Sequence, residues 1–174
     1  MPLSTLVITS TRCQFTDMAE RLQACLDKFP KIESLKPEQK QALEALLAGE
    51  DVLAILPTGF GKSLIYQVFC QAQSSTNTSV LVISPLNSIV EEQTSEMSGL
   101  GIPSVHLKPS SEECLKYVSE GKFKIIFGSA EDCLSKPFQD LLKSQCTGPH
   151  ISMVVIDECH TVETWYVKSN FRLL

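Results

Sequence analysis

Short apolar runs alternate with longer mixed segments along this chain. The apolar runs predict strands at residues 52–56, 80–84, 104–107, 124–128 and 152–157. The mixed segments predict helices at residues 17–29, 37–48, 62–73, 86–97, 111–120 and 136–143. Near-continuous apolar runs are typical of strands covered on both faces, and helices of this length fit the crossovers between parallel strands. The pattern therefore predicts an α/β protein with a parallel sheet.

Composition and charge narrow the class of protein. The chain has 174 residues, of which 43% are hydrophobic and 20% charged, enough for one core and one domain. No run approaches the ~20 apolar residues of a membrane span, and the apolar patch at residues 6–8 lacks the basic leader of a signal peptide. We therefore expect an intracellular chain that is not secreted. A net charge of -5 and a pI near 5.2 argue against a broad basic face, so any nucleic-acid contact should be local.

Cysteine and histidine positions give no sign of a metal centre. The 7 cysteines form no C-x-x-C pair, and the 3 histidines share no ligand spacing. We expect reduced thiols and no structural metal.

The clearest chemical signal is the turn at residues 56–63 (LPTGFGKS), which follows a predicted strand. Gly59 and Gly61 allow backbone N–H groups to turn toward phosphates, and Lys62 can reach the β and γ phosphates. The hydroxyl of Ser63 suits Mg²⁺, and the helix that follows adds its positive N-terminal end. This loop predicts ATP binding.

A second signal closes the last predicted strand, at residues 153–160 (MVVIDECH). Asp157 at the strand tip is placed to hold Mg²⁺ through water, and Glu158 to orient and deprotonate an attacking water. An acidic surface turn is the alternative, but the phosphate loop upstream favours catalysis. The two motifs together predict an ATPase that uses ATP and Mg²⁺.

In their order and surroundings these motifs resemble a RecQ-like helicase of superfamily 2, over roughly residues 30–165. The resemblance implies a RecA-like P-loop three-layer sandwich with a mainly parallel sheet. It implies DNA as the partner, 3′ to 5′ movement and a role in recombination or repair, in the nucleus or another intracellular DNA compartment. It also implies a phosphate-loop role for Thr58 and catalytic roles for Lys62, Asp157, Glu158 and His160.

Another stretch extends the resemblance to the residues that recognise the adenine base of ATP. Residues 35–39 (LKPEQ) resemble the RecQ adenine-recognition motif. The resemblance implies that Gln39 reads the adenine edge and that Lys36 packs beside the ring, where the family usually has arginine. Because lysine lacks a planar fork, adenine selectivity is expected to be looser.

Nucleic-acid contacts are implied in the same way. Residues 84–93 resemble the motif that contacts the DNA backbone, and residues 129–131 stand where the family has a Pro-Glu motif. The segment after His160 resembles a loop that couples DNA contact to ATP hydrolysis, with altered spacing. The implied contact residues are Ser84, Pro85, Leu86, Gln93, Ser129 and Trp165.

The family continues beyond the point where this sequence stops. We expect an N-terminal extension at residues 1–15, a truncated first lobe at 16–174 and no second lobe, so that turnover by this chain alone should be slow. The family's Ser-Ala-Thr strand lies between the phosphate-loop strand and the acidic-motif strand. Without it, the strands at 52–56 and 152–157 should stand roughly 10 Å apart with unpaired backbone, or close up. Either outcome predicts a poorly soluble or loosely packed chain.

Two other functions stay open at this stage. A non-catalytic nucleotide-binding or nucleic-acid-binding module would keep the fold without turnover, but intact Lys62, Asp157 and Glu158 favour the enzyme. An RNA helicase would share the ATP motifs, but residues 35–39 and Trp165 fit the DNA helicases better.

Overall fold

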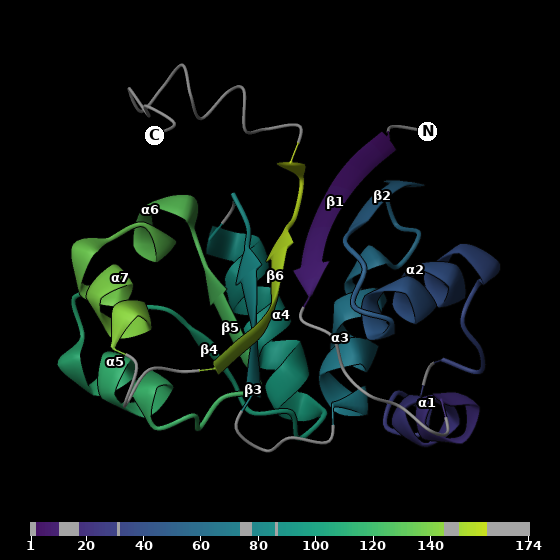
Figure 1. The fold of residues 1–174 in the computed structure, drawn as a ribbon, viewed down its shortest axis with the longest axis horizontal. Helices are drawn as coiled ribbons and strands as arrows, with labels where there is room; N and C mark the ends of the chain where they lie inside the picture. Colours follow the sequence, from purple (N-terminus) through teal and green to yellow (C-terminus); the bar gives the residue numbers. More distant parts are fainter. Residues whose placement is uncertain are drawn as a thin grey trace.

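The computed structural model describes residues 3–10, 18–30, 32–73, 78–85, 87–144 and 150–159. A six-stranded sheet with the order β2-β1-β6-β3-β5-β4 forms its centre (Figure 1). The strands are β1 (Leu3–Ser10), β2 (Val52–Pro57), β3 (Thr78–Ile83), β4 (Ser104–His106), β5 (Ile125–Gly128) and β6 (His150–Ile156). The helices are α1 (Met18–Leu26), α2 (Pro37–Leu47), α3 (Lys62–Ala72), α4 (Asn87–Gly99), α5 (Glu112–Ser119), α6 (Ala130–Cys133) and α7 (Lys136–Lys143).

Helices pack on both faces of the sheet and create two separate cores. Successive side chains of a strand point to opposite faces of the sheet, so neighbouring residues of β3 enter different cores. Val80 and Val82 join the core beneath α1, α2, α3 and α4. Leu81, between them, joins the second core with residues of α5, α6 and α7. Strands β6, β3, β5 and β4 run parallel to one another. The α/β class and the mainly parallel sheet are confirmed.

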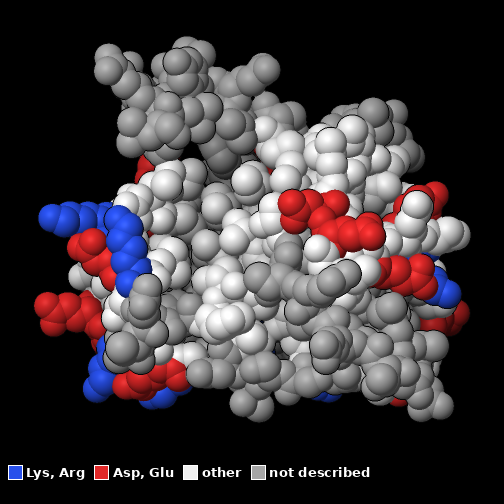
Figure 2. All heavy atoms as spheres, in the orientation of Figure 1, with Lys and Arg blue, Asp and Glu red and all other residues white. Residues whose placement is uncertain are grey.

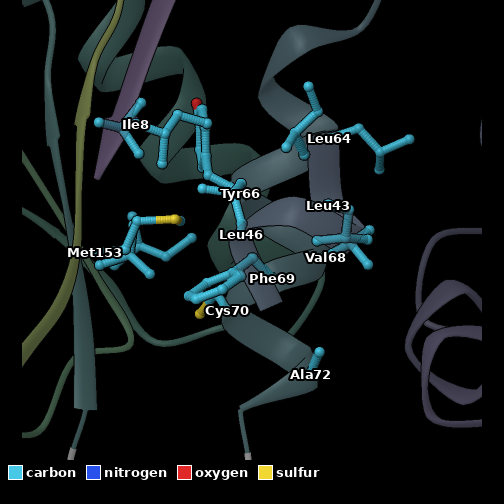
Figure 3. Packing of buried hydrophobic residues seen from close by; sticks show 14 of the residues in the cluster. Ile8, Leu43, Leu46, Leu64, Tyr66, Val68, Phe69, Cys70, Ala72 and Met153 are labelled. Carbon is cyan, nitrogen blue, oxygen red and sulfur yellow. The ribbon is translucent and has the colours of Figure 1, made fainter. Parts of the chain in front are cut away.

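The first core is dominated by α3, which lies against the middle of the sheet. Ile65, Tyr66, Val68 and Phe69 are all fully buried, and Figure 3 shows α3 side chains facing Met153 of β6 across this core. Because α3 directly follows the phosphate loop, this packing fixes the loop against the sheet.

The strand β1 lies in the place where the sequence predicted a gap. It pairs antiparallel with β2 on one side and with β6 on the other. Its Leu6 and Ile8 are fully buried in the first core. The expected open gap is therefore wrong, because residues 3–10, expected to belong to an extension, supply the missing hydrogen-bond partners. The sheet is mixed rather than wholly parallel for the same reason.

The expectation that the apolar strands are covered on both faces is wrong for β2. In the described part of the sheet β2 pairs only with β1 and forms an edge. Its Leu53 and Ile55 are 61% and 55% exposed, whereas Ala54 between them is buried. Helices α5 to α7 cover only the half of the sheet around β3, β5 and β4. The aggregation risk predicted for the sheet centre therefore applies to this edge instead.

Candidate nucleotide-binding site

The residues expected to bind ATP come together at one edge of the sheet. Strands β2, β6, β3 and β5 point the same way, because β1 is antiparallel to both β2 and β6. The phosphate loop follows β2, and Asp157 follows β6, where its backbone N–H donates to the Ile83 carbonyl over 2.9 Å. The carboxyl ends of parallel strands are where α/β proteins bind ligands.

The phosphate loop has the backbone geometry that its glycines predict. Gly59 and Gly61 have φ angles of 77° and 88°, in the left-handed region that other residues rarely adopt. Gly61 is the N-cap of α3, and Lys62 begins the helix with only 8% of its surface exposed. The first backbone N–H groups of α3 therefore point into the turn, which suits a phosphate.

The first turn of α2 clasps this loop. The side-chain amide of Gln39 donates from Nε2 to the carbonyls of Phe60 and Gly61 over 3.1 and 2.9 Å. Its Oε1 accepts from the backbone N–H of Lys36 over 2.9 Å, so the amide orientation is fixed by its partners. A Cβ on Gly61 would approach Gln39 Nε2 to 2.8 Å. Glycine at this position therefore allows the clasp as well as the turn.

Lys36, the N-cap of α2, reinforces the clasp. Its Nζ donates to the Phe60 carbonyl over 3.0 Å and lies 4.0 Å from the centre of the Phe60 ring. Phe60 was not among the predicted site residues, since it occupies the variable position of the loop motif. The aromatic ring that Lys36 contacts in this structure is therefore that of Phe60, a residue of the same chain.

The acidic pair at the end of β6 has an unusual backbone. Glu158 has a φ of 52°, and its N–H donates to Asp157 Oδ1 over 2.9 Å. Such a conformation is uncommon outside glycine and is found at functional sites. Asp157 is only 9% exposed, at the edge where the phosphate loop also lies. The donor set of the Ser63 hydroxyl and this carboxylate fits Mg²⁺, which prefers oxygen ligands and retains part of its water.

The residues predicted to bind nucleic acid fall into different surroundings. Ser84 is fully buried at the end of β3, where its N–H donates to the Gly128 carbonyl. The Ser129 hydroxyl caps α6, accepting from the backbone of Asp132 and donating to its carboxylate over 2.8 Å. Pro85 lies just after β3. Leu86, His160 and Trp165 lie outside the described residues.

Gln93, predicted at the DNA interface, reaches the nucleotide site instead of lying free on α4. Its Nε2 donates to the Ser63 hydroxyl over 3.5 Å. Sequence reasoning also missed Tyr66, one turn beyond Lys62 on α3, whose apolar neighbours in the sequence give it the character of a core residue. Only the spacing of three from Ser63 could have drawn attention to it.

The N-terminal half of β1 also lies at this edge. Leu3 stands opposite Pro57, and Val7 stands opposite Ile156. The first residues of β1 therefore separate the phosphate loop from the acidic pair. Burial raises the pKa of the Cys159 thiol, and a hydrogen bond with the Thr5 side chain offsets part of that rise. Cys159, the residue after the acidic pair, therefore contacts this strand.

The charge distribution fits local rather than broad nucleic-acid contact. In the view of Figure 2, acidic side chains gather on the side of α2 and β2. The lysines visible in this view lie mainly at the opposite edge, among acidic groups. The described part of this face therefore carries no continuous basic surface. Among the described residues, no helix is long and apolar enough to cross a membrane, and no group of His, Cys, Asp and Glu is arranged to hold a metal.

The sequences of known proteins match most of this chain. Residues 36–174 match the family described as DEAD/DEAH box helicase. The chain is 32% identical over 157 residues to ATP-dependent DNA helicase Q-like 5 of Arabidopsis thaliana, covering 88% of this chain and 16% of that protein. It is 32% identical over 151 residues to probable ATP-dependent DNA helicase RecS of Bacillus subtilis, covering 83% and 29%. It is 31% identical over 138 residues to ATP-dependent DNA helicase RecQ of Pasteurella multocida, covering 76% and 21%. The chain thus spans less than a third of the length of these relatives.

Proposed function

Because the chain belongs to the DEAD/DEAH box helicase family, we propose that it is the ATP-binding motor lobe of a RecQ-like, ATP-dependent DNA helicase. The observation that carries the proposal is the meeting of the phosphate loop and the acidic pair at one edge of the sheet. A strand-to-helix turn alone would be weak support. The clasped loop, the buried Lys62 and the acidic pair after β6 form a complete first half of an ATPase site.

Each residue of the site has a distinct task in this proposal. Backbone N–H groups of the loop bind the phosphates, with Thr58 in the turn, and Lys62 neutralises charge on the β and γ phosphates. Ser63 and Asp157 would hold Mg²⁺, and the ion would supply charge neutralisation at the phosphates. Glu158 orients the attacking water and accepts its proton. His160 is proposed to act with this acidic pair, following its place in the motif.

We assign the selection of adenine over other bases to the clasp formed by Gln39 and Lys36. Both hydrogens of Gln39 Nε2 are used by loop carbonyls, and Oε1 has one bond, from Lys36. A second lone pair of Oε1 remains to accept from an amino group such as that on C6 of adenine. Guanine carries an oxygen at that position and would offer no hydrogen. Lys36 is proposed to pack beside the base when ATP binds, exchanging its contact with Phe60 for it.

DNA is the proposed polymer, since the relatives compared are named as DNA helicases. The proposed contacts are Ser84, Pro85, Leu86, Ser129 and Trp165, of which Ser84, Pro85 and Ser129 directly follow β3 and β5 at the same edge of the sheet. A second lobe in a longer protein would complete the ATP site and move the strand in the 3′ to 5′ direction. We propose that the lobe includes β1 together with the family-matched residues 36–174, and that it has a nuclear role in recombination or repair.

Calorimetric titration with ATP in Mg²⁺ tests the proposal directly. We expect the unmodified chain to bind ATP and Lys62→Ala to lose that binding, because no other loop side chain carries the positive charge. Lys40→Ala is the matched control: its side chain is 62% exposed on α2 and should not affect affinity. Equal ATP affinity in Lys62→Ala and in the unmodified chain would remove the loop from the site.

Direction of movement needs a protein that includes a second lobe. In a form of the chain joined to such a lobe, strand displacement is measured on duplexes with a 3′ or a 5′ single-stranded overhang. Displacement restricted to the 3′ overhang is expected. Displacement of an RNA duplex with no activity on DNA would assign the lobe to an RNA helicase instead.

A further inference from the structure

Polar side chains of α3 and α4 meet in the interior beneath the phosphate loop. Gln93 on α4 donates from Nε2 to the Ser63 hydroxyl on α3. Tyr66, three residues beyond Ser63, is fully buried, and Figure 3 shows its side chain among those directed from α3 toward the sheet. The hydroxyl assigned to Mg²⁺ is therefore backed by side chains from two helices.

Two buried polar atoms in this cluster have no hydrogen-bond partner among the described residues. They are the Tyr66 hydroxyl and Gln93 Oε1. Buried polar atoms nearly always have partners, so each exception needs an explanation such as a water or an ion. Both atoms belong to residues that are neighbours of Ser63. The ring of Tyr66 packs in the first core, edge-on to Phe127 of β5, so its hydroxyl is the part of the side chain that core packing does not explain.

Tyr66 lies three residues after Ser63 on α3, a spacing at which side chains of one helix are neighbours. Its phenol therefore lies beside the hydroxyl proposed for Mg²⁺, in the interior of the protein. A tyrosine needed only for packing would be served equally well by phenylalanine, which brings no polar atom into the core.

The hydrogen-bonding capacity of Ser63 explains what Gln93 does. A serine hydroxyl has one hydrogen and two lone pairs. Donation from Gln93 occupies one lone pair, which leaves the other for a cation and the hydrogen for a neighbouring oxygen. The donated bond thus restricts the rotation of a hydroxyl that would otherwise turn freely. Groups that orient a metal ligand in this way affect metal affinity even though they do not touch the metal.

We propose that Gln93 and Tyr66 are positioning residues for Mg²⁺-dependent ATP binding. Gln93 orients the Ser63 hydroxyl through its hydrogen bond, and the unpartnered Tyr66 hydroxyl would bind water beside that hydroxyl. The inference rests on the proposed function, since it needs ATP at the phosphate loop. It assigns Gln93 to the metal side of the site, although its helix follows the Ser84-Pro85 turn that is proposed to contact DNA.

The test measures ATP affinity twice for each variant, once with Mg²⁺ and once with EDTA. The ratio of the two dissociation constants, the Mg²⁺ enhancement, is the readout. Gln93→Met keeps the side-chain length without hydrogen bonds, and Tyr66→Phe removes only the hydroxyl. Each should reduce the Mg²⁺ enhancement by about tenfold, the lower end for groups that orient metal ligands. Affinity in EDTA should stay unchanged.

Controls separate positioning from a folding defect. Tyr117→Phe removes a hydroxyl from α5 and should leave the Mg²⁺ enhancement unchanged. In a Ser63→Ala background, Gln93→Met should have no further effect, because it acts through that hydroxyl. If Gln93→Met does not fold, Tyr66→Phe alone decides the outcome, since it preserves the ring.

The possible failures are distinguishable. Full Mg²⁺ enhancement in Gln93→Met and Tyr66→Phe, or equal losses with Mg²⁺ and with EDTA, would overturn the inference and leave ATP binding standing. Absence of ATP binding by the unmodified chain in both conditions would overturn the proposed function and the inference together.

Discussion

Replacement of Ile8 by alanine is the sharpest test of the central strand β1. Ile8 is fully buried, it stands opposite Val52 on β2 and Val155 on β6, and it packs in the core with α3. Removing a buried isoleucine side chain down to alanine costs about 2–5 kcal/mol. The upper half of that range is expected, because strands on both sides hold the backbone and the cavity cannot collapse easily.

The assay is urea unfolding followed by circular dichroism, with thermal unfolding as a second measure. For a chain of this size a loss of 2–5 kcal/mol corresponds to a fall in Tm of roughly 4–20 °C. Leu53→Ala is the matched control, since it also truncates an aliphatic strand residue but at a site 61% exposed. It should cost under about 1 kcal/mol. If Ile8→Ala cost no more than Leu53→Ala, β1 would not occupy the sheet centre.

The remaining predictions concern the nucleotide site. Glu158→Gln should keep ATP affinity while abolishing turnover in a form joined to a second lobe. A fall in affinity with an unchanged rate per bound ATP would show that Glu158 has a structural role instead. Gln39→Ala removes two hydrogen bonds to the loop, worth about 1 kcal/mol each, and should lower both ATP affinity and the preference for ATP over GTP in competition titrations. An equal loss for both nucleotides would refute base reading. Gly61→Ala should cost at least roughly 1–2 kcal/mol, because φ is 88° and the new Cβ would meet Gln39 at 2.8 Å. Gly99→Ala, with nothing within 4 Å, is its control in the same melting and binding assays.

Sequence patterns predicted strands and turns correctly where a few neighbouring residues determine them. The apolar runs and the turns between them predicted β2, β3, β5 and β6, and the phosphate loop followed from a few residues at fixed spacing. Strand β1 could not be predicted in the same way. Its residues 6–8 form a short apolar patch, and its place depends on β2 and β6, both remote in sequence. Pairing partners of this kind are not encoded in a local period.

The site was predicted only in part, for a related reason. Spacing identifies which residues bind phosphate, but it says little about what supports them. Phe60 occupies a variable position in its motif, and its contact with Lys36 exists only because α2 folds over the loop. Gln93 meets Ser63 only through the packing of α4 against α3. Support of this kind arises from tertiary contacts between helices.

The position of β1 also affects how the chain reaches its native state. Val7 pairs with Ile156, so the chain must be made as far as β6 before the middle of the sheet can close. Contacts this distant in sequence slow folding, because the entropy of closing a long loop is lost before the contact forms. The family match at residues 36–174 does not include β1. During synthesis, the apolar side chains of Leu6 and Ile8 would remain exposed until β6 emerges, which makes this first segment a natural binding site for chaperones.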